Sequence, residues 1–324
     1  MNKIYCYFWT LFQQIKIHIT LKVYHSIDSL SSSIKSVVTI GTFDGVHKGH
    51  NHILENLISI AKRKGLESLV LTFHPHPRHV LFPENQDLFL LDTIDEKIAK
   101  IDKMGIDHLV ICRFDKEFSR IKSTQFIRDI LIGKLNMEHM VVGYDHHFGQ
   151  NRKGSFKELQ ELSLLYSFDL DKISAQEVCD ISVSSTKIRN ALLEGNLDKA
   201  NMFLGDYYIL SGTIIHGQKL GRKIGFPTAN ISMDKSKLIP SPGVYIVKVF
   251  IDNLDLFGML NISFNSNKIE VHIFDFSEKI YGKNIQAKLL FRLRDEKVFG
   301  NLKELRIQLE KDEIDAKYYI RNKF

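Results

Sequence analysis

The first half of the chain alternates two kinds of apolar pattern. Short runs rich in β-branched and other apolar residues predict buried strands at residues 36–40, 68–73, 108–112 and 139–143. Between them, apolar residues recur with helical spacing at residues 53–61, 93–101, 126–131 and 185–200, the last with Gly195 inside it. Thr93 and Glu96 form a capping box, and Gly65 and Gly105 stand where helices are expected to end. Strand and helix in repetition predict a parallel sheet, whose ligands gather at the carboxyl ends of the strands.

From about Tyr207 the pattern changes to short strands without long helices between them. The strand-like runs are separated by Gly, Pro, Asn and Asp and cover residues 208–214, 244–251, 256–262, 269–274 and 286–293. This spacing predicts an antiparallel barrel or sandwich. One amphipathic helix is expected to end the chain, with an apolar side formed by Leu302, Leu305, Leu309, Ala316 and Tyr319. The domain boundary is expected between Gly195 and Asp206.

Length and composition fit two globular domains in a reducing cytoplasm. The 324 residues are 44% hydrophobic and 25% charged, and no stretch is long and apolar enough to span a bilayer. The net charge of +6 is spread along the chain, which disfavours a nucleic-acid surface and fits small anionic substrates such as nucleotides. Cys6, Cys112 and Cys179 lie far apart and indicate neither a disulfide framework nor a metal site. Residues 1–20 are apolar but interrupted by polar residues, so an extension of unclear role is expected rather than a signal peptide.

The segment GTFDGVHKGH, residues 41–50, stands between a predicted strand and a predicted helix. His47 and His50 would lie in the first helical turn, where free N–H groups and the helix dipole favour phosphate. Imidazole donors there can follow charge onto a phosphorus centre, and Gly45 and Gly49 allow close approach of the backbone. The alternative is a pair of helix-cap histidines in an ordinary α/β turn.

A second polar segment, VSSTKIR, occupies residues 183–189. Ser184 or Ser185 is a good N-cap, and Arg189 lies one turn further on, so the segment has the geometry of an anion site. The alternative is a plain N-cap followed by a surface arginine.

Together the two segments resemble the H-x-G-H nucleotidyltransferase superfamily, whose members transfer a nucleotidyl group from a nucleoside triphosphate and release pyrophosphate. The resemblance implies that His47 and His50 are catalytic. It implies ATP contacts from Gly41, Phe43, Asp44, Gly49, Ser184, Ser185, Thr186 and Arg189.

Residues 72–77 (TFHPHP) and 143–154 (GYDHHFGQNRKG) look like the bacterial FMN adenylyltransferase branch of that superfamily. The branch implies flavin contacts from His74, Pro75, Asp145, Phe148 and Arg152. The family usually has an arginine where this chain has His147, which changes the charge available at one contact. The histidine spacings match no zinc pattern.

A third segment, residues 217–230 (GQKLGRKIGFPTAN), follows a predicted strand, whereas a P-loop motif is absent from the sequence. Its glycines and Pro227 favour an open loop with backbone amides facing phosphate. Thr228 and Asn230 offer neutral oxygens that suit Mg²⁺. The alternative is a basic surface hairpin.

This segment resembles riboflavin kinase, and residues 242–245, 270–276 and 292–299 match that family in order. By this resemblance Glu270 is the general base, and Arg294 and Glu296 contact the flavin. The ATP contacts implied are Gly217, Gly221, Arg222, Gly225 and Thr228, and the metal ligands are Thr228 and Asn230. Residues 263–268 form a shorter loop than the family has and lack its Pro-Thr pair, so we expect flavin affinity or lid closure to differ.

The resemblance covers residues 21–324 and implies a bifunctional enzyme that phosphorylates riboflavin to FMN and adenylylates FMN to FAD with ATP and Mg²⁺. It implies a Rossmann-like α/β domain at residues 21–200 and an antiparallel β-barrel domain with a C-terminal helix at residues 206–324. Small molecules are the expected partners, without nucleic acid, membrane or an obligate protein. Alternatives are a nucleotidyltransferase for another phosphate acceptor, a flavin- or nucleotide-binding regulator that has lost kinase activity, and a nucleic-acid-binding module.

Overall fold

A computed structural model describes residues 20–31, 33–84, 88–143, 155–173, 183–217, 220–264 and 268–324. These residues form two compact units. The first takes its described residues from the ranges 20–42, 51–83 and 98–173, and the second from the ranges 43–50, 84–97 and 183–324. The histidine-containing loop that follows residue 42 therefore belongs to the second unit.

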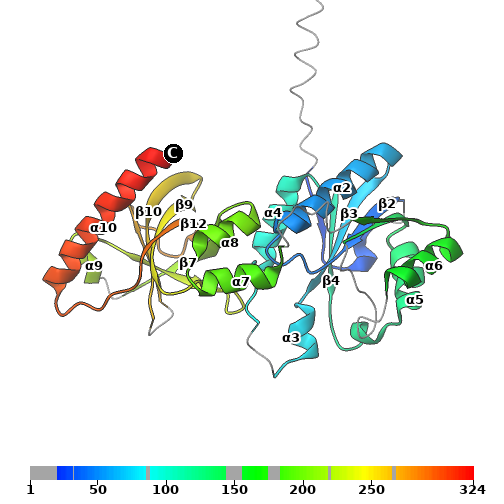
Figure 1. The fold of residues 1–324 in the computed structure, drawn as a ribbon, viewed down its shortest axis with the longest axis horizontal. Helices are drawn as coiled ribbons and strands as arrows, with labels where there is room; N and C mark the ends of the chain where they lie inside the picture. Colours follow the sequence, from blue (N-terminus) through cyan, green and yellow to red (C-terminus); the bar gives the residue numbers. More distant parts are fainter. Residues whose placement is uncertain are drawn as a thin grey trace, which may run out of the picture. The chain divides into compact units, whose positions relative to one another are not determined.

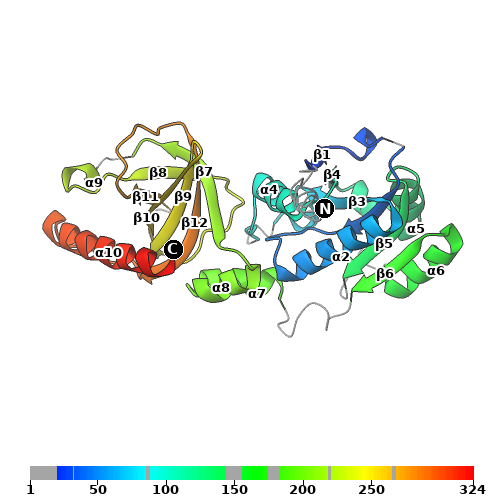
Figure 2. The ribbon, with the colours of Figure 1, turned by 90° about the horizontal axis from the view of Figure 1, so that it is seen from above.

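The first unit is built on a six-stranded parallel sheet with the order β1-β4-β3-β2-β5-β6. Its strands are β1 Lys22–Tyr24, β2 Ser36–Ile40, β3 Glu67–His74, β4 His108–Arg113, β5 Met137–Gly143 and β6 Asp169–Ile173. Every residue of β2 is buried, as is usual for a central parallel strand, so the parallel sheet predicted from apolar runs is confirmed. Figure 2 shows β1 and β6 at the two ends of the strand order.

Helices connect these strands, at α2 Lys48–Lys64, α3 Pro77–Leu81, α4 Ile94–Met104, α5 Ser123–Gln125 with the π-helical turn η3 Phe126–Ile132, and α6 Phe156–Tyr166. Short 3₁₀ turns lie at η1 Ile27–Ser29 and η2 Phe118–Arg120. The predicted capping box is confirmed, because Thr93 N donates to Glu96 Oε2 at 3.0 Å and Glu96 N donates to Thr93 Oγ1 at 3.2 Å. Gly65 and Gly105 follow α2 and α4 with φ of 66° and 80°.

The helical pattern at residues 185–200 is interrupted, and the expectation of a segment that continues through Gly195 was wrong. The structure has two helices, α7 Ser185–Leu193 and α8 Leu197–Leu204. Gly195 has a φ of 77°, and Asn196 caps α8 by accepting from Lys199 N. The left-handed glycine ends α7 because a regular helix cannot continue through that conformation.

The second unit contains a closed six-stranded antiparallel barrel with the order β10-β11-β8-β7-β12-β9. Its strands are β7 Tyr208–Ile215, β8 Ala229–Met233, β9 Gly243–Ile251, β10 Leu254–Ile262, β11 Ile269–Ile273 and β12 Asn284–Arg294. The short helix α9 Leu220–Lys223 lies between β7 and β8. Along β9, Tyr245 and Val247 join the main core of the unit, whereas Val244 and Ile246 join a smaller cluster with Ala316.

The C-terminal helix α10 Leu302–Lys323 lies along the outside of the barrel (Figure 1). Ala316 is fully buried against the barrel, as its place in the predicted apolar side implies. Leu302, which was assigned to the same side, is 47% exposed because it opens the helix directly after the cap residue Asn301. Among the described residues, no helix is long and apolar enough to cross a membrane.

Candidate functional site

The loop that leads from β2 into α2 has an unusual backbone. Phe43 and Val46 have φ of 45° and 39°, and Gly45 has a φ of 91°. Such conformations cost a non-glycine residue about 1–3 kcal/mol and persist where the surrounding structure holds them. A Cβ on Gly45 would lie 2.8 Å from Leu91 Cδ1, so a glycine is required there by both space and conformation.

His47 and His50 lie together where α2 begins. The backbone N–H of His50 donates to Nδ1 of His47 at 3.4 Å, so His47 caps the helix with its side chain. The two rings are stacked, with centroids 3.7 Å apart and an angle of 15° between planes. The ring of Phe43 lies 5.1 Å from that of His50. The structure thus brings the two imidazoles to the positive end of a helix, where anions are favoured.

Asp44 anchors this loop from within. Its Oδ1 accepts hydrogen bonds from the N–H groups of Leu91, at 2.9 Å, and Asp92, at 3.3 Å. Its Oδ2 forms an ion pair with Nη2 of Arg189. Burial raises the pKa of Asp44, and the Arg189 guanidinium opposes that rise.

The start of α7 meets the same loop. Ser184 caps α7 by accepting from Lys187 N at 3.3 Å, and Ser185 Oγ donates to the carbonyl of Asp44 at 2.9 Å. Thr186 is exposed beside them. Arg189 also donates from Nε to the carbonyl of Phe89 at 2.8 Å, so its guanidinium is held within the protein. Ser185 and Arg189 therefore contact Asp44, and Ser184 caps the helix that carries both of them.

The other candidate residues of the first site lie at the ends of strands, in the first turn of α2 or outside the described residues. Gly41 follows β2 and donates its N–H to Leu71 O at 3.1 Å, and Gly49 is buried in the first turn of α2. His74 ends β3, is exposed and precedes Pro75 through a cis peptide bond. Outside the described residues lie Asp145, His147, Phe148 and Arg152.

Five candidate residues of the second site converge at one side of the barrel. Glu270 on β11 is the register partner of Asn230 on β8. Gly217 packs so closely on Asn230 that an added Cβ would lie 1.9 Å from Nδ2. A Cβ on Gly221 would lie 2.1 Å from Phe226 O and 3.4 Å from Thr228 Oγ1. Gly217 and Gly221 are thereby packed against residues 226–230. A plain basic surface hairpin would not require this close packing.

The remaining candidates of the second site are placed differently. Arg222 and Gly225 are exposed in the turn around α9, and Gly225 has a φ of 87°. Arg294 forms a bidentate pair with the buried carboxylate of Asp312 on α10, with Nη2 to Oδ2 at 2.6 Å and Nε to Oδ1 at 2.9 Å. Glu296 accepts the N–H of Phe264 at 2.5 Å, at the start of the shortened loop.

A cluster of buried charges beside the first site was missed by sequence reasoning. Lys97 is buried near Asp44 and Asp92, and burial lowers its pKa while the two carboxylates oppose that shift. Glu96 and Lys237 form a second buried ion pair, at 2.5 Å. Glu96 was identified only as part of a capping box, and nothing in the local pattern around Lys237 indicates burial.

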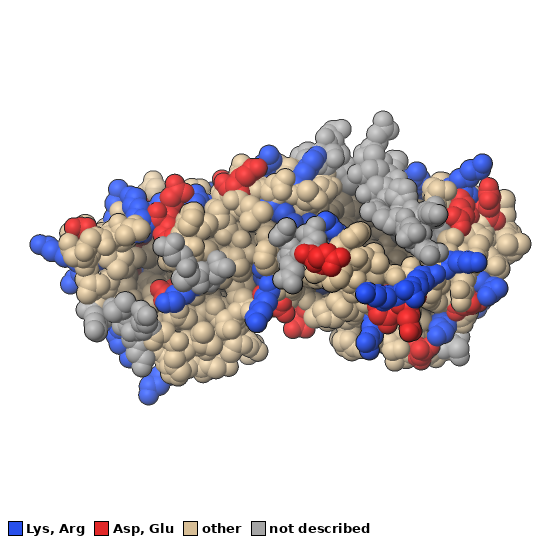
Figure 3. All heavy atoms as spheres, turned by 90° about the horizontal axis from the view of Figure 1, so that it is seen from below, with Lys and Arg blue, Asp and Glu red and all other residues tan. Residues whose placement is uncertain are grey.

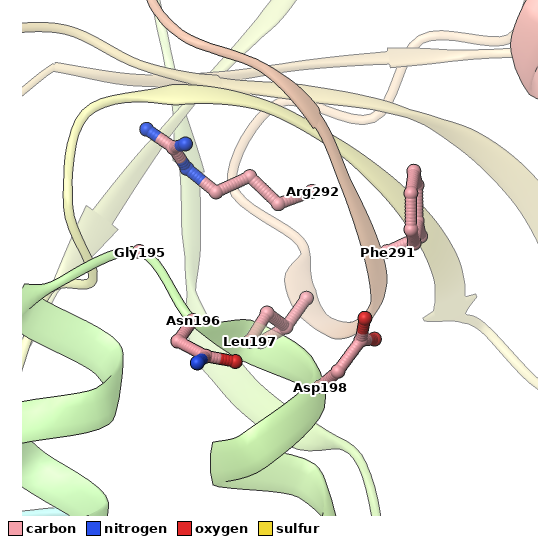
Figure 4. A pocket seen from close by; sticks show the side chains of 6 residues that line it. All are labelled: Gly195, Asn196, Leu197, Asp198, Phe291 and Arg292. Atoms are coloured by element: carbon pink, nitrogen blue, oxygen red, sulfur yellow. The ribbon is translucent and has the colours of Figure 1, made fainter.

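A pocket of about 210 Å³ lies between the start of α8 and β12. Figure 4 shows Phe291 and Arg292 on the strand side, with the other lining residues on the helix side; the full lining is Gly195, Asn196, Leu197, Asp198, Phe291 and Arg292. None of the candidate site residues lines this pocket.

Two family models match the chain, one in each half. The FAD synthetase model matches residues 30–187 and the riboflavin kinase model matches residues 204–320. With the parallel sheet and the barrel, these matches define a transferase that combines a nucleotidyltransferase and a kinase.

Relatives extend the similarity over most of the chain. The chain is similar to bifunctional riboflavin kinase/FMN adenylyltransferase of Bacillus subtilis, with 37% identity over 306 residues, 89% of this chain and 93% of the relative. The Escherichia coli K12 protein of the same name is 35% identical over 310 residues, which cover 92% of this chain and 98% of that relative. A Streptococcus pneumoniae crystal structure titled as a macrolide-efflux protein superposes with a TM-score of 0.82 at 29% identity, covering 92% of this chain and 98% of that one.

The chain belongs to the bifunctional riboflavin kinase/FMN adenylyltransferase family, as its motifs predicted. It is an enzyme of FAD biosynthesis, for which riboflavin, FMN and FAD are substrates or products.

Proposed function

We propose that residues 43–50 and the start of α7 form the FMN adenylyltransferase centre, and that residues 217–230 with Glu270 form the riboflavin kinase centre. ATP is the donor in both reactions. The first assignment rests on the stacked pair of His47 and His50 at the start of α2. The second rests on the register of Glu270 with Asn230 and the close packing of Gly217 on Asn230.

In the kinase centre, Glu270 takes the proton of the riboflavin 5′-hydroxyl as its oxygen attacks the γ-phosphorus of ATP. Thr228 and Asn230 would hold Mg²⁺, and their neutral oxygens suit a small hard cation shared with phosphate. The missing side chain of Gly217 supports this assignment, because a Cβ there would displace the Asn230 amide. When bound, the ion supplies positive charge to the transferring phosphoryl group. Gly217, Gly221, Arg222 and Gly225 are proposed to surround the nucleotide phosphates.

In the adenylyltransferase centre, a phosphate oxygen of FMN attacks the α-phosphorus of ATP and pyrophosphate leaves. His47 and His50 donate hydrogen bonds to the phosphate oxygens as charge develops on them. Ser184, Ser185 and Thr186 offer hydroxyl and backbone donors at the start of α7. A phosphate contact by Arg189 would compete with its ion pair to Asp44.

The remaining assignments are proposals of the same kind. The flavin contacts are His74, Pro75, Asp145, Phe148 and Arg152 in the first centre and Arg294 and Glu296 in the second. We propose a first domain at residues 21–200, a second at residues 206–324, and action in the cytoplasm on small molecules without nucleic acid, membrane or an obligate protein partner. On the face that Figure 3 shows, basic and acidic side chains are interspersed, which disfavours a nucleic-acid surface there.

The test compares two variants of the full chain in chromatographic time courses with Mg²⁺ and excess ATP. H47A/H50A should lower FAD formation from FMN by about 10²-fold or more and leave FMN formation from riboflavin intact. E270Q should do the reverse, with a loss of about 10²–10⁴-fold in FMN formation. H52A, two residues beyond His50 on α2, is the matched control and should leave both rates unchanged. Undiminished FAD formation by H47A/H50A would remove the first assignment.

A further inference from the structure

A lysine from the connection between β8 and β9 is completely buried. The side chain of Lys237 is 0% exposed. Its segment lies beside residue 90 as in a parallel sheet, with Leu90 N donating to Ser236 O at 2.7 Å and Leu238 N donating to Leu90 O at 2.8 Å. Sequence-distant segments are therefore fixed to each other at this point of the second unit.

The ammonium of Lys237 is directed to groups of residues 88–97. It donates to Leu91 O and to Glu96 Oε2, each at 2.5 Å. It also lies 4.4 Å from the centre of the Tyr208 ring. A buried ammonium needs such partners, and this one has a carboxylate, a carbonyl and an aromatic face.

The carbonyl that Lys237 holds belongs to a residue that contacts the histidine-containing loop. Leu91 donates its N–H to Asp44 Oδ1 at 2.9 Å, and its side chain is the nearest neighbour of Gly45. Lys237 thus holds Leu91 at its carbonyl, while Asp44 holds the same residue at its N–H. A short chain of hydrogen bonds therefore links the loop to a buried lysine of the barrel unit.

We propose that Lys237 is a positioning residue for FMN adenylylation. It fixes the backbone at Leu91, which fixes Asp44 and thereby the loop that carries His47 and His50. The proposal rests on the proposed role of these two histidines. In the described part of the chain, the hydrogen bonds of its ammonium group go to Leu91 and Glu96 and not to the kinase candidates. Lys237, which supports FMN adenylylation, thus comes from the half of the chain that matches the riboflavin kinase family.

Because both reactions occur in one chain, the kinase activity serves as an internal control for folding. In K237M, which keeps the length of the side chain without its charge, kcat for FMN adenylylation should fall about 10–100-fold, since misplacement by about 1 Å can cost 10²-fold. The KM for FMN and the kcat for riboflavin phosphorylation should stay within about twofold. K235M, an exposed lysine two residues away, should leave both activities unchanged.

A second variant keeps the proposal testable if K237M does not fold. K237M/E96Q leaves no unpaired buried carboxylate, and glutamine can still serve in the capping box with Thr93. It should retain kinase activity and lose adenylylation, because Leu91 O still lacks its donor. Unchanged adenylylation in K237M, or an equal fall of both activities in both variants, would overturn the proposal. If H47A/H50A leaves adenylylation unchanged in the same assay, the proposed site fails instead.

Discussion

Replacing Gly217 with alanine should slow riboflavin phosphorylation by about 10²-fold without unfolding the barrel. A Cβ at this position would lie 1.9 Å from Nδ2 and 2.9 Å from Cγ of Asn230. Ordinary contact begins at 3.4 Å, so the Asn230 amide must move by about 1.5 Å. The atom that moves is the end of a flexible side chain, which can rotate at little cost in folding free energy.

The size of the effect follows from the position of Asn230. A displacement of about 1 Å in a reacting geometry can cost about 10²-fold in rate, which corresponds to about 2.7 kcal/mol on the barrier. Stability should change in the opposite sense. Gly217 has no left-handed φ, and an alanine that fits its backbone stabilises a protein by about 0.4–1 kcal/mol through the unfolded state. The variant should therefore lose activity while its melting temperature stays the same or rises slightly.

The assay measures FMN formation from riboflavin and FAD formation from FMN in one G217A preparation, together with thermal unfolding. FAD formation should be unchanged. G300A is the matched control, because its Cβ would meet Glu304 at an ordinary 3.6 Å. Riboflavin phosphorylation within threefold of the parent protein would show that Asn230 has no part in the kinase centre. A large fall in melting temperature would refute the steric reasoning.

Three further predictions concern stability and reactivity. D312A should destabilise the chain by about 3 kcal/mol in urea unfolding, because it removes a buried carboxylate and leaves the mostly covered guanidinium of Arg294 without its partner. E310A, at an exposed ion pair, should cost less than about 1 kcal/mol, and equal costs of the two variants would contradict this view. Burial lowers the pKa of His139, so its contribution to stability is present above pH 6.5 and is lost as the pH falls through the lower folded-state pKa. H139Q should therefore lose less melting temperature than the parent between pH 7.5 and 5, and parallel curves would contradict the assignment. Burial also raises the pKa of the Cys112 thiol to about 12. Iodoacetamide at pH 8 should therefore label Cys112 only after the chain is unfolded, which mass spectrometry of its peptides will measure. Labelling of Cys112 in the folded chain would refute this prediction.

The sheet was predictable where its strands are buried and not where they are exposed. β2 is buried along its whole length and reads as a continuous apolar run. β6 lies at the edge with the sequence DLDKI and has one buried residue, so neither alternation nor an apolar run reveals it. β8 was missed for a similar reason, because its residues are mostly partly exposed and follow directly on the Thr-Ala-Asn segment.

The candidate sites were predictable as motifs but not as contacts. The spacing of His47 and His50 indicates a helix start, and the structure places them there. Nothing in the sequence indicates that Arg189 pairs with Asp44, because the partners are 145 positions apart. Arg294 likewise resembles a flavin contact in its motif, whereas its guanidinium is fixed to α10. Pairings of this kind are decided by tertiary packing, which local patterns do not encode.

The two centres differ in what keeps their residues in place. Asn230 and Glu270 lie on paired strands of a closed barrel, so the hydrogen bonds of the sheet fix their separation. The loop before α2 contains two non-glycine residues at positive φ and a buried carboxylate, and both features cost free energy in the folded state. Its conformation is maintained by the N–H groups of Leu91 and Asp92, by Arg189 and by the hydroxyl of Ser185. The proposed adenylyltransferase centre therefore depends on segments far apart in the sequence, whereas Asn230 and Glu270 of the proposed kinase centre are held by their own paired strands.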